Sequence, residues 1–357
     1  MVTSIPASKT RTLIYGAYGY TGQLTAEVAA ARQVDVVLAG RNREALTQLG
    51  TRLNLATRVV GLDDADALAN ALHDVRSVIH MAGPFAVTAQ PMLNACLRTR
   101  TNYVDITGEI AVFEEVWSRR AEIERAGITV LPGSGFDVVP SDCVAAHAAG
   151  QLERPRALVL AFRGLDSASR GTLQTAIRDV SRPVLCRRGG RIVPLDDRSP
   201  RSVDFGSGAE KCLPVSWGDV ATAFYSTGAD DITVYFRETP LLKSMAVAQR
   251  RFGWLLGSAA MQRLLAAAIR RAPEGPNASE RRRHRTTVWA EAVDGQGRRV
   301  RSALSTHDPY EFTANSVLEI TKRIHALSTP LGVVTPSQAF GAEFALAVPG
   351  CCRVDAP

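Results

Sequence analysis

Three glycines follow the first apolar run of the chain at a spacing that suits a phosphate group. The stretch reads GAYGYTG, so Gly16, Gly19 and Gly22 stand three residues apart, directly after Thr12–Tyr15. A turn that binds pyrophosphate needs a tight exit from a strand, a bare Cα where the phosphates approach, and a bare Cα where the next helix packs on the sheet. The spacing GxxGxxG is a variant of GxGxxG, and its place between a strand and a helix favours a dinucleotide site over a purely structural turn.

The second apolar run indicates which dinucleotide is bound. NAD is held through its ribose 2′-hydroxyl by an acidic side chain about 20 residues after the glycines. The run Val34–Ala39 is instead followed by Gly40, Arg41 and Asn42, with no acid. An arginine at this position suits a 2′-phosphate, because it can form charge-assisted, bidentate hydrogen bonds with it. We therefore predict NADP(H) as the cofactor.

Further cofactor contacts are expected where other strands end. Asp63 follows the third apolar run, where an adenine ring would lie, and Ala82-Gly83-Pro84 follows the fourth, near the expected nicotinamide ribose. Turn chemistry is the alternative interpretation for both stretches. The residues that we predict to contact the cofactor all lie in these turns or at the start of the first helix: Gly16, Tyr18, Gly19, Tyr20, Thr21, Gly22, Arg41, Asn42, Asp63, Ala82, Gly83 and Pro84.

Hydride chemistry with such a cofactor also needs a proton source and a group that stabilises an oxyanion. Ligands of a doubly wound sheet bind at the carboxyl ends of its strands. This rule selects Tyr103, Asp105 and Glu109 after the fifth apolar run and Asp137 after the sixth as candidate catalytic residues. Each has a structural alternative, since the aspartates could cap helices and Tyr103 could be a core residue. A Tyr-x-x-x-Lys pair is excluded, because none of the seven tyrosines has a lysine four residues later.

The elements that must position these residues alternate regularly over the first part of the chain. The expected strands are Thr12–Tyr15, Val34–Ala39, Thr57–Leu62, Ser77–Ala82, Asn102–Ile106 and Ile128–Leu131. The expected helices are Thr21–Arg32, Arg43–Leu53, Asp64–Leu72, Gln90–Arg98 and Ile110–Ala126. Such alternation predicts right-handed βαβ units and a parallel sheet. We predict an α/β, Rossmann-type doubly wound domain over residues 1–150.

The pattern becomes mixed after residue 150. The expected strands are Ala157–Phe162, Asp231–Arg237, Thr287–Val293 and Arg298–Leu304, with a hairpin turn over 294–297 between the last two. The expected helices are Thr172–Val180, Ser141–Ala149 and Phe312–Leu327. We predict a mixed α+β domain for substrate or dimerisation over 151–310, and a C-terminal helix and tail over 311–357 that packs back on the first domain.

Residues 241–271 form the most apolar long segment, and basic residues flank it at both ends. We favour core helices here, with a partner or homodimer surface and a helix lying in a membrane interface as the alternatives. Gln262 and Arg263 interrupt the segment, so it is not expected to span a bilayer. Since the first residues of the chain also lack the apolar part of a secretion signal, we expect a cytoplasmic protein without a transmembrane segment.

The composition adds limits on partners and metals. The 42 Lys and Arg outnumber the 35 Asp and Glu, for a net charge of +7, and such a surface attracts acidic partners. The densest basic run, 280–285, has no interleaved aromatic residue, and we interpret it as a solvated loop, with an anion patch as the alternative. We expect no nucleic acid partner. The six cysteines form no CxxC pair and the six histidines are scattered, so no metal site is predicted.

Several stretches together resemble a known family. GAYGYTG, AGRN, MAGPF, NYVDITGEIAVFEEV and LPGSGFDVVPSDC, within residues 11–145, are similar to the saccharopine dehydrogenase-like NADP-binding oxidoreductases, in particular the bacterial trans-acting enoyl reductases that serve polyketide synthases. The resemblance implies that NADPH reduces a C=C bond of an enoyl group, either of a small molecule or on a carrier protein. It also implies cofactor contacts from Gly16, Gly19, Gly22, Arg41 and Gly83.

Two other functions stay open. An imine or amino-acid reductase of the saccharopine type would bind a dicarboxylate through paired arginines, for which Arg163, Arg170 and Arg178 are candidates. A non-enzymatic protein could use the same fold to sense a nucleotide or to associate with a membrane through residues 241–271. The absence of a usable acid near the nicotinamide would favour this last function.

Overall fold

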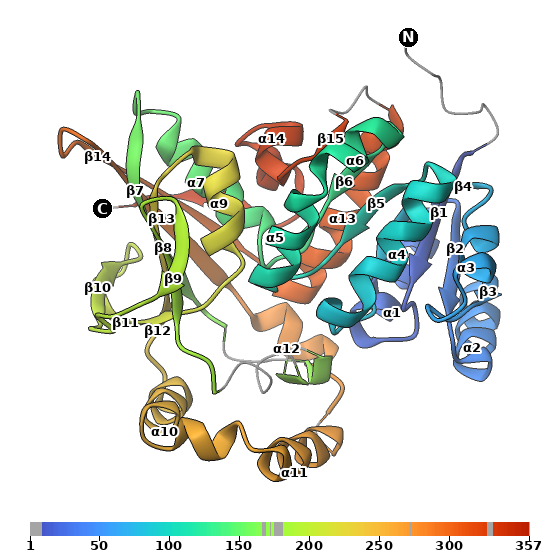
Figure 1. The fold of residues 1–357 in the computed structure, drawn as a ribbon, viewed down its shortest axis with the longest axis horizontal. Coiled ribbons are helices and arrows are strands. Elements are labelled where there is room, and N and C mark those ends of the chain that lie inside the picture. Colours follow the sequence, from blue (N-terminus) through green and yellow to red (C-terminus); the bar gives the residue numbers. More distant parts are fainter. Residues whose placement is uncertain are drawn as a thin grey trace. The chain divides into compact units, whose positions relative to one another are not determined.

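The chain divides into two units, each with its own sheet. The structure is a computed structural model that describes residues 9–165, 169–171, 173–174, 181–271, 273–326 and 331–356 (Figure 1). The first unit consists of Met1–Cys143 and Pro309–Gly350, and the second of Val144–Asp308 and Cys351–Pro357. The predicted helix Thr172–Val180 lies, except for residues 173 and 174, outside the described residues.

The sheet of the first unit has seven parallel strands in the order β15-β6-β5-β4-β1-β2-β3. From β1 the chain adds β2 and β3 on one side and then β4, β5 and β6 on the other, which is the reversal of strand order that defines a doubly wound sheet. The predicted fold class is confirmed. The strands are β1 (Arg11–Tyr15), β2 (Val36–Gly40), β3 (Ala56–Val59), β4 (Val75–His80), β5 (Asn102–Asp105), β6 (Thr129–Leu131) and β15 (Gly332–Val333).

Helices cover both faces of this sheet, and neighbouring residues of β1 point to different faces. Leu13 packs in a core with side chains of α3, α4, α5 and α6, whereas Ile14 packs in a core with α1, α2 and α13. Successive side chains of a strand alternate in this way, so a strand buried on both sides is apolar throughout. The helices are α1 (Tyr20–Ala31), α2 (Arg43–Leu53), α3 (Ala65–Ala71), α4 (Phe85–Thr99), α5 (Ile110–Ser118), α6 (Arg120–Ala126), α13 (Pro309–Ala326) and α14 (Pro336–Phe340), with the 3-10 turn η1 (Phe344–Ala347).

The second unit contains a mixed sheet with the main order β10-β11-β12-β7-β13-β14-β16, and β8 and β9 attach to β12. Strands β7 and β12 are parallel and the other pairs are antiparallel. Its strands are β7 (Pro155–Arg163), β8 (Leu185–Arg188), β9 (Arg191–Pro194), β10 (Arg201–Asp204), β11 (Ala209–Val215), β12 (Asp231–Arg237), β13 (Thr286–Asp294), β14 (Arg299–Thr306) and β16 (Cys352–Val354). Its helices are α9 (Asp219–Thr227), α10 (Pro240–Leu256), α11 (Ala259–Arg270) and α12 (Ala278–Arg283), while α7 (Val139–Ala149) belongs to both units.

Several predicted elements differ from the structure. Helix α4 begins at Phe85 instead of Gln90, because the carboxylate of Glu109 satisfies the first backbone N–H groups of an additional turn. The predicted helix Ile110–Ala126 is two helices, which meet at Arg119 with φ −93° and ψ 8°. The basic run 280–285, predicted as a solvated loop, lies partly in the short helix α12, which a capping box of Asn277 and Glu280 begins.

The preferred interpretation of residues 241–271 as core helices is wrong. These residues lie largely in α10 and α11, where α10 has no buried residue and α11 has one, Ile269. Trp254 is 79% exposed and Leu241 is 69% exposed. The helical spacing was interpreted correctly, but a spacing does not show which surface the apolar side chains meet. Within the described residues, every helix is too short or too polar to cross a bilayer.

A candidate dinucleotide site at the carboxyl edge of the first sheet

The glycine turn brings together the ends of β1, β4 and the start of α1. A Cβ atom on Gly16 would lie 2.9 Å from the Cβ of Ala82, and the φ of Gly16 is +80°. A Cβ atom on Gly22 would lie 2.3 Å from the carbonyl oxygen of Gly16. Both contacts are shorter than any side chain tolerates, so both positions require glycine for packing. This close approach places the first turn of α1 directly at the carboxyl edge of the sheet.

Gly19 differs from its neighbours because the protein itself leaves the space beside it open. It is exposed, and the only described atom within 4 Å of a Cβ built there would be the carbonyl oxygen of Gly16, at 3.3 Å. Gly19 is the N-cap of α1, no side chain caps this helix, and its first turn has no acidic residue. An uncapped helix N-terminus carries free N–H groups and a partial positive charge. The turn therefore fits a pyrophosphate beside Gly19.

The residues expected at the adenosine end gather around the ends of β1 and β2. The ring of Tyr18 packs on Gly40, whose Cβ would lie 2.6 Å from Tyr18 Cε1. The Tyr15 hydroxyl donates a hydrogen bond to the carbonyl of Val60 at 3.2 Å. Burial raises the pKa of Tyr15 to about 12, with Tyr18 acting in the same direction and the exposed Arg41 in the opposite one. Arg41 is therefore close enough to act on this group, and it follows β2 with no acid beside it.

Two predicted turn residues begin helices. Asn42 caps α2, since its side-chain oxygen accepts a hydrogen bond from Ala45 N at 3.1 Å. Asp64 caps α3 in the same way, whereas its neighbour Asp63 is exposed. Asn42 caps the helix through its side-chain oxygen, which leaves the amide nitrogen for another partner. The contact of Asp63 with the cofactor stays a prediction.

The turn after β4 is held by the carboxylate of Glu109, which directly precedes α5. Glu109 accepts hydrogen bonds from Phe85 N at 2.8 Å and Ala86 N at 3.0 Å, and so caps α4. The Gly83–Pro84 peptide bond is cis, and Gly83 is exposed. A carboxylate that accepts two backbone N–H groups is held in place by them. Glu109 therefore orients the turn that is predicted to meet the nicotinamide ribose.

Tyr103 and Asp105 form a buried network between β5 and β6. Both residues are fully buried, and the Tyr103 hydroxyl donates a hydrogen bond to Asp105 Oδ2 at 2.6 Å. Asp105 Oδ1 accepts hydrogen bonds from the backbone N–H groups of Thr107 and Gly133, each at 2.9 Å. Burial raises the pKa of Asp105 to about 6, although these hydrogen bonds favour ionisation. The network ties together the two turns that follow β5 and β6.

Asp137 is the candidate acid whose protonation can change near neutral pH. It keeps a partly exposed surface, but protein atoms surround it densely, and this burial raises its pKa to about 7. Its Oδ2 lies 2.9 Å from the position that a Cβ on Gly108 would take. Gly108 follows β5 and Asp137 follows β6, so the carboxyl group lies at the same edge of the sheet as the glycine turn.

His80 was missed by the sequence analysis. It is fully buried as the last residue of β4, and its Nε2 forms a hydrogen bond with Thr88 Oγ1 at 3.0 Å. Its ring contacts those of Tyr15, Phe85 and Tyr103. Burial lowers the pKa of His80 to about 3, so the ring is neutral and packs as a core group. Its position directly before the MAGPF stretch is the sequence feature that could have identified it as a residue near the site.

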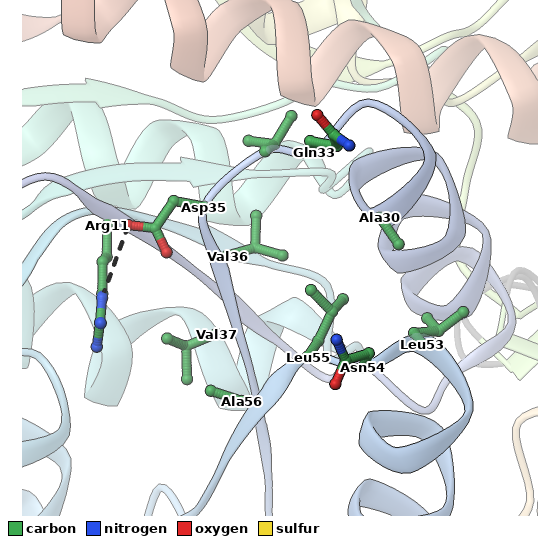
Figure 2. A pocket seen from close by; sticks show the side chains of 11 residues that line it. Arg11, Ala30, Gln33, Asp35, Val36, Val37, Leu53, Asn54, Leu55 and Ala56 are labelled. Carbon is green, nitrogen blue, oxygen red and sulfur yellow. Dashed lines mark ion pairs between the residues drawn. The ribbon is translucent and has the colours of Figure 1, made fainter.

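A pocket of about 370 Å³ lies at the opposite, amino edge of the first three strands (Figure 2). Arg11 and Asp35 line it and form an ion pair at 3.6 Å, and the apolar side chains of Val36, Leu53 and Leu55 complete much of the wall. Ligands of doubly wound sheets bind at the carboxyl ends of the strands. This pocket is therefore separate from the candidate dinucleotide site.

Of the three arginines proposed for a dicarboxylate substrate, Arg163 has a carboxylate partner within the protein. Arg163 forms an ion pair with Glu210 at 3.0 Å and also contacts Ser207. Arg170 is described, but Arg178 lies outside the described residues.

Comparison with known proteins agrees with this geometry. Residues 12–131 match the family described as saccharopine dehydrogenase NADP binding domain. A saccharopine dehydrogenase-like oxidoreductase from Bos taurus is 26% identical over 179 residues, which are 44% of this chain and 42% of that protein. A trans-acting enoyl reductase from Mycobacterium leprae is 31% identical over 138 residues, 36% of this chain and 33% of that protein. Apo saccharopine dehydrogenase (L-Glu forming) from Saccharomyces cerevisiae, a solved structure, has a TM-score of 0.63 at 14% identity and covers 97% of this chain and 100% of its own.

Residues 12–131 are therefore a saccharopine dehydrogenase-type NADP binding domain, and the chain has the fold of saccharopine dehydrogenase. The matched domain is one that binds NADP. The predicted resemblance and the predicted cofactor are confirmed. The chain spans less than half the length of the two curated relatives that it matches.

Proposed function

We propose that this protein is an NADP(H)-dependent oxidoreductase that reduces the C=C bond of an enoyl substrate. The observation that carries the proposal is Asp137, a carboxyl group with a pKa of about 7 at the same sheet edge as the glycine turn. An acid that is partly protonated at neutral pH can donate a proton there. The name of the Mycobacterium leprae relative, a trans-acting enoyl reductase, supports the same chemistry.

The cofactor part of the proposal rests on the shape and charge of the turn. The open space beside Gly19 would take the pyrophosphate, and Arg41 would pair with a 2′-phosphate. When bound, NADPH supplies the hydride of the reaction. Ala82, Gly83 and Pro84 would then lie beside the nicotinamide ribose, on a turn that Glu109 holds in place.

In the proposed reaction, the residues of the chain position the reactants and transfer a proton. Reducing an enoyl group places negative charge on the carbonyl oxygen and requires a proton at the α-carbon. Asp105 accepts hydrogen bonds from three protein donors, which favour its ionised form, and Glu109 accepts two backbone N–H groups of α4. Asp137 lies at the same sheet edge with a pKa of about 7, and we assign it the role of proton donor. A carrier-protein-bound substrate and an acidic carrier surface are compatible with the net charge of +7.

A binding experiment tests the cofactor assignment. The purified protein is titrated with NADPH and with NADH, and nicotinamide fluorescence is followed for wild type, Arg41→Ala and the control Arg125→Ala, an exposed arginine of α6. We expect Arg41→Ala to lower the affinity for NADPH by about 10-fold or more, as for a lost charge-assisted contact, while Arg125→Ala does not. If neither nucleotide binds, the non-enzymatic alternative is favoured.

An activity experiment tests the reaction. Oxidation of NADPH is followed with a short enoyl thioester and, separately, with a cyclic imine, for wild type and Asp137→Asn. We expect wild type to reduce the thioester and Asp137→Asn to lose at least about 100-fold in kcat with NADPH binding intact, in the range of general-acid catalysis. Turnover of the imine alone would favour C=N reduction, and unchanged kcat in Asp137→Asn would exclude this residue as the acid.

A further inference from the structure

Helices α10 and α11 carry large apolar side chains on an exposed surface. In Figure 1 the two helices, gold to orange, lie apart from the strands of their own unit. We call the following residues the α10–α11 surface, all of them at least 38% exposed: Leu241, Met245, Val247, Phe252, Trp254, Leu255 and Leu264. An exposed apolar patch of this kind marks a surface that meets a partner or a membrane.

The exposed apolar residues of α10 lie on more than one face of the helix, which is kinked at Phe252. Leu241 and Met245 stand four residues apart and share a face, whereas Val247, six residues after Leu241, lies on another. The side chain of Gln249, four residues after Met245, donates a hydrogen bond to the carbonyl of Arg182 and so anchors the helix to its own unit. The apolar side chains nevertheless stay outside the core, since no residue of α10 is buried.

The charge around this surface has one sign. Between Thr239 and Pro273 the sequence contains six basic residues and no Asp or Glu. All six are exposed. Lys243 pairs with Glu238 at 3.6 Å, whereas the five arginines form no ion pair with any described residue: Arg250, Arg251, Arg263, Arg270 and Arg271. These arginines are available to an anionic partner.

We propose that the α10–α11 surface binds the anionic surface of a lipid bilayer. The apolar side chains would enter the boundary between headgroups and acyl chains, and the arginines would reach the phosphates, as in helices that lie in the plane of a membrane. Trp254 suits this boundary, where tryptophan is enriched. A second copy of the chain is a poorer occupant, because pairing two α10–α11 surfaces would bring together ten exposed arginines, none of which has an acidic partner among the described residues.

Trp254 supplies a spectroscopic test on the full chain. Of the four tryptophans, Trp117 is 6% exposed, Trp289 is 3% exposed and Trp217 is partly buried, whereas Trp254 is 79% exposed. We expect its emission to shift to the blue on mixing with phosphatidylcholine vesicles that contain phosphatidylglycerol, but not with pure phosphatidylcholine. The protein should sediment with the anionic vesicles, and added salt should release it.

Two matched pairs of arginines separate this surface from the net charge. Each basic residue near an anionic membrane contributes about fivefold to binding, so Arg250→Gln with Arg251→Gln should lower the vesicle partition coefficient by about 25-fold. The control, Arg282→Gln with Arg283→Gln on α12, removes the same charge outside the surface and should change binding less than about threefold. Trp254→Ala should abolish the blue shift and weaken sedimentation, while circular dichroism verifies that each variant is folded.

Three results would overturn the proposal. The first is no sedimentation of wild type with phosphatidylglycerol vesicles at low salt. The second is an equal loss in the α10 and α12 variants, which would mean that only net charge matters. The third is a lipid-free dimer in analytical ultracentrifugation that Trp254→Ala converts to monomer, which would assign the surface to a second copy. None of these measurements depends on the proposed enzymatic activity.

Discussion

Replacing Asp105 by alanine should destabilise the first unit, whereas replacing it by asparagine should not. The carboxylate is fully buried and serves three donors, the Tyr103 hydroxyl and the backbone N–H groups of Thr107 and Gly133. Leaving a buried donor without a partner costs about 1–3 kcal/mol, so three donors correspond to roughly 6 kcal/mol. Removing the buried charge offsets part of this cost.

The size of the offset follows from the pKa of Asp105. Burial raises this pKa from 3.8 to about 6, and a difference of about two pH units at 1.36 kcal/mol each amounts to about 3 kcal/mol. At pH 7 we therefore expect Asp105→Ala to lower the free energy of unfolding by about 3 kcal/mol. Asparagine keeps one oxygen for the two N–H groups and carries no charge, and the removal of the charge outweighs the lost acceptor of the Tyr103 hydroxyl. Asp105→Asn should be at least as stable as wild type.

The pH dependence of the free energy of unfolding tests the same prediction independently. Because the folded pKa of Asp105 lies above its unfolded value, protonation stabilises the folded state, and this contribution is complete below about pH 4 and lost as the pH rises through about 6. In urea titrations, the stability of Asp105→Asn minus that of wild type should grow by about 3 kcal/mol from pH 4 to pH 7. A constant difference, or an Asp105→Asn as unstable as Asp105→Ala, would refute the reasoning. Stable Asp105→Asn without activity would instead indicate a catalytic role.

Three further predictions concern the glycine turn, its neighbouring loop and the candidate acid. Gly22→Ala should disrupt the turn and destabilise the protein by about 2 kcal/mol or more, because its Cβ would lie 2.3 Å from the carbonyl oxygen of Gly16. Gly19→Ala should instead keep the thermal midpoint and lose NADPH binding. Calorimetry measures the first effect and fluorescence titration with NADPH the second. Glu109→Ala should cost about 1–2 kcal/mol by leaving α4 uncapped, measured by urea unfolding against Glu109→Gln, which retains one acceptor. If Asp137 donates the proton, kcat with an enoyl thioester should fall as the pH rises through about 7, and a flat profile would argue against this role.

The fold of the first unit could be predicted from local pattern because its strands are buried on both faces and its helices alternate with them. Helix α2 has the predicted bounds Arg43–Leu53, since Asn42 at its start and Asn54 at its end supply local signals. Strand β15 was not predicted. Its two residues, Gly332–Val333, become a strand only by pairing with β6, about 200 residues earlier in the chain. Such a pairing leaves no local pattern to read.

The candidate site was predictable in position but less so in role. The topology of a doubly wound sheet is enough to bring Asp105, Glu109 and Asp137 to one edge. What each carboxyl group does there depends on partners far along the chain, such as Gly133 for Asp105 and Phe85 for Glu109. The sequence shows neither these partners nor the burial that separates the pKa of Asp137 from that of an ordinary carboxylate.

Residues 241–271 show where periodicity stops being informative. A stripe of apolar residues at helical spacing predicts a helix with one dry face, and the same stripe would serve a core, a dimer or a membrane equally well. The charges around it discriminate better, because a core-facing helix of an ordinary domain carries both signs on its solvated face. Between Thr239 and Pro273 there are six basic residues and no acid, and of these only Lys243 pairs with a described carboxylate, that of Glu238. An anionic bilayer would supply the remaining counter-charge, together with an apolar phase for Trp254 and Leu241.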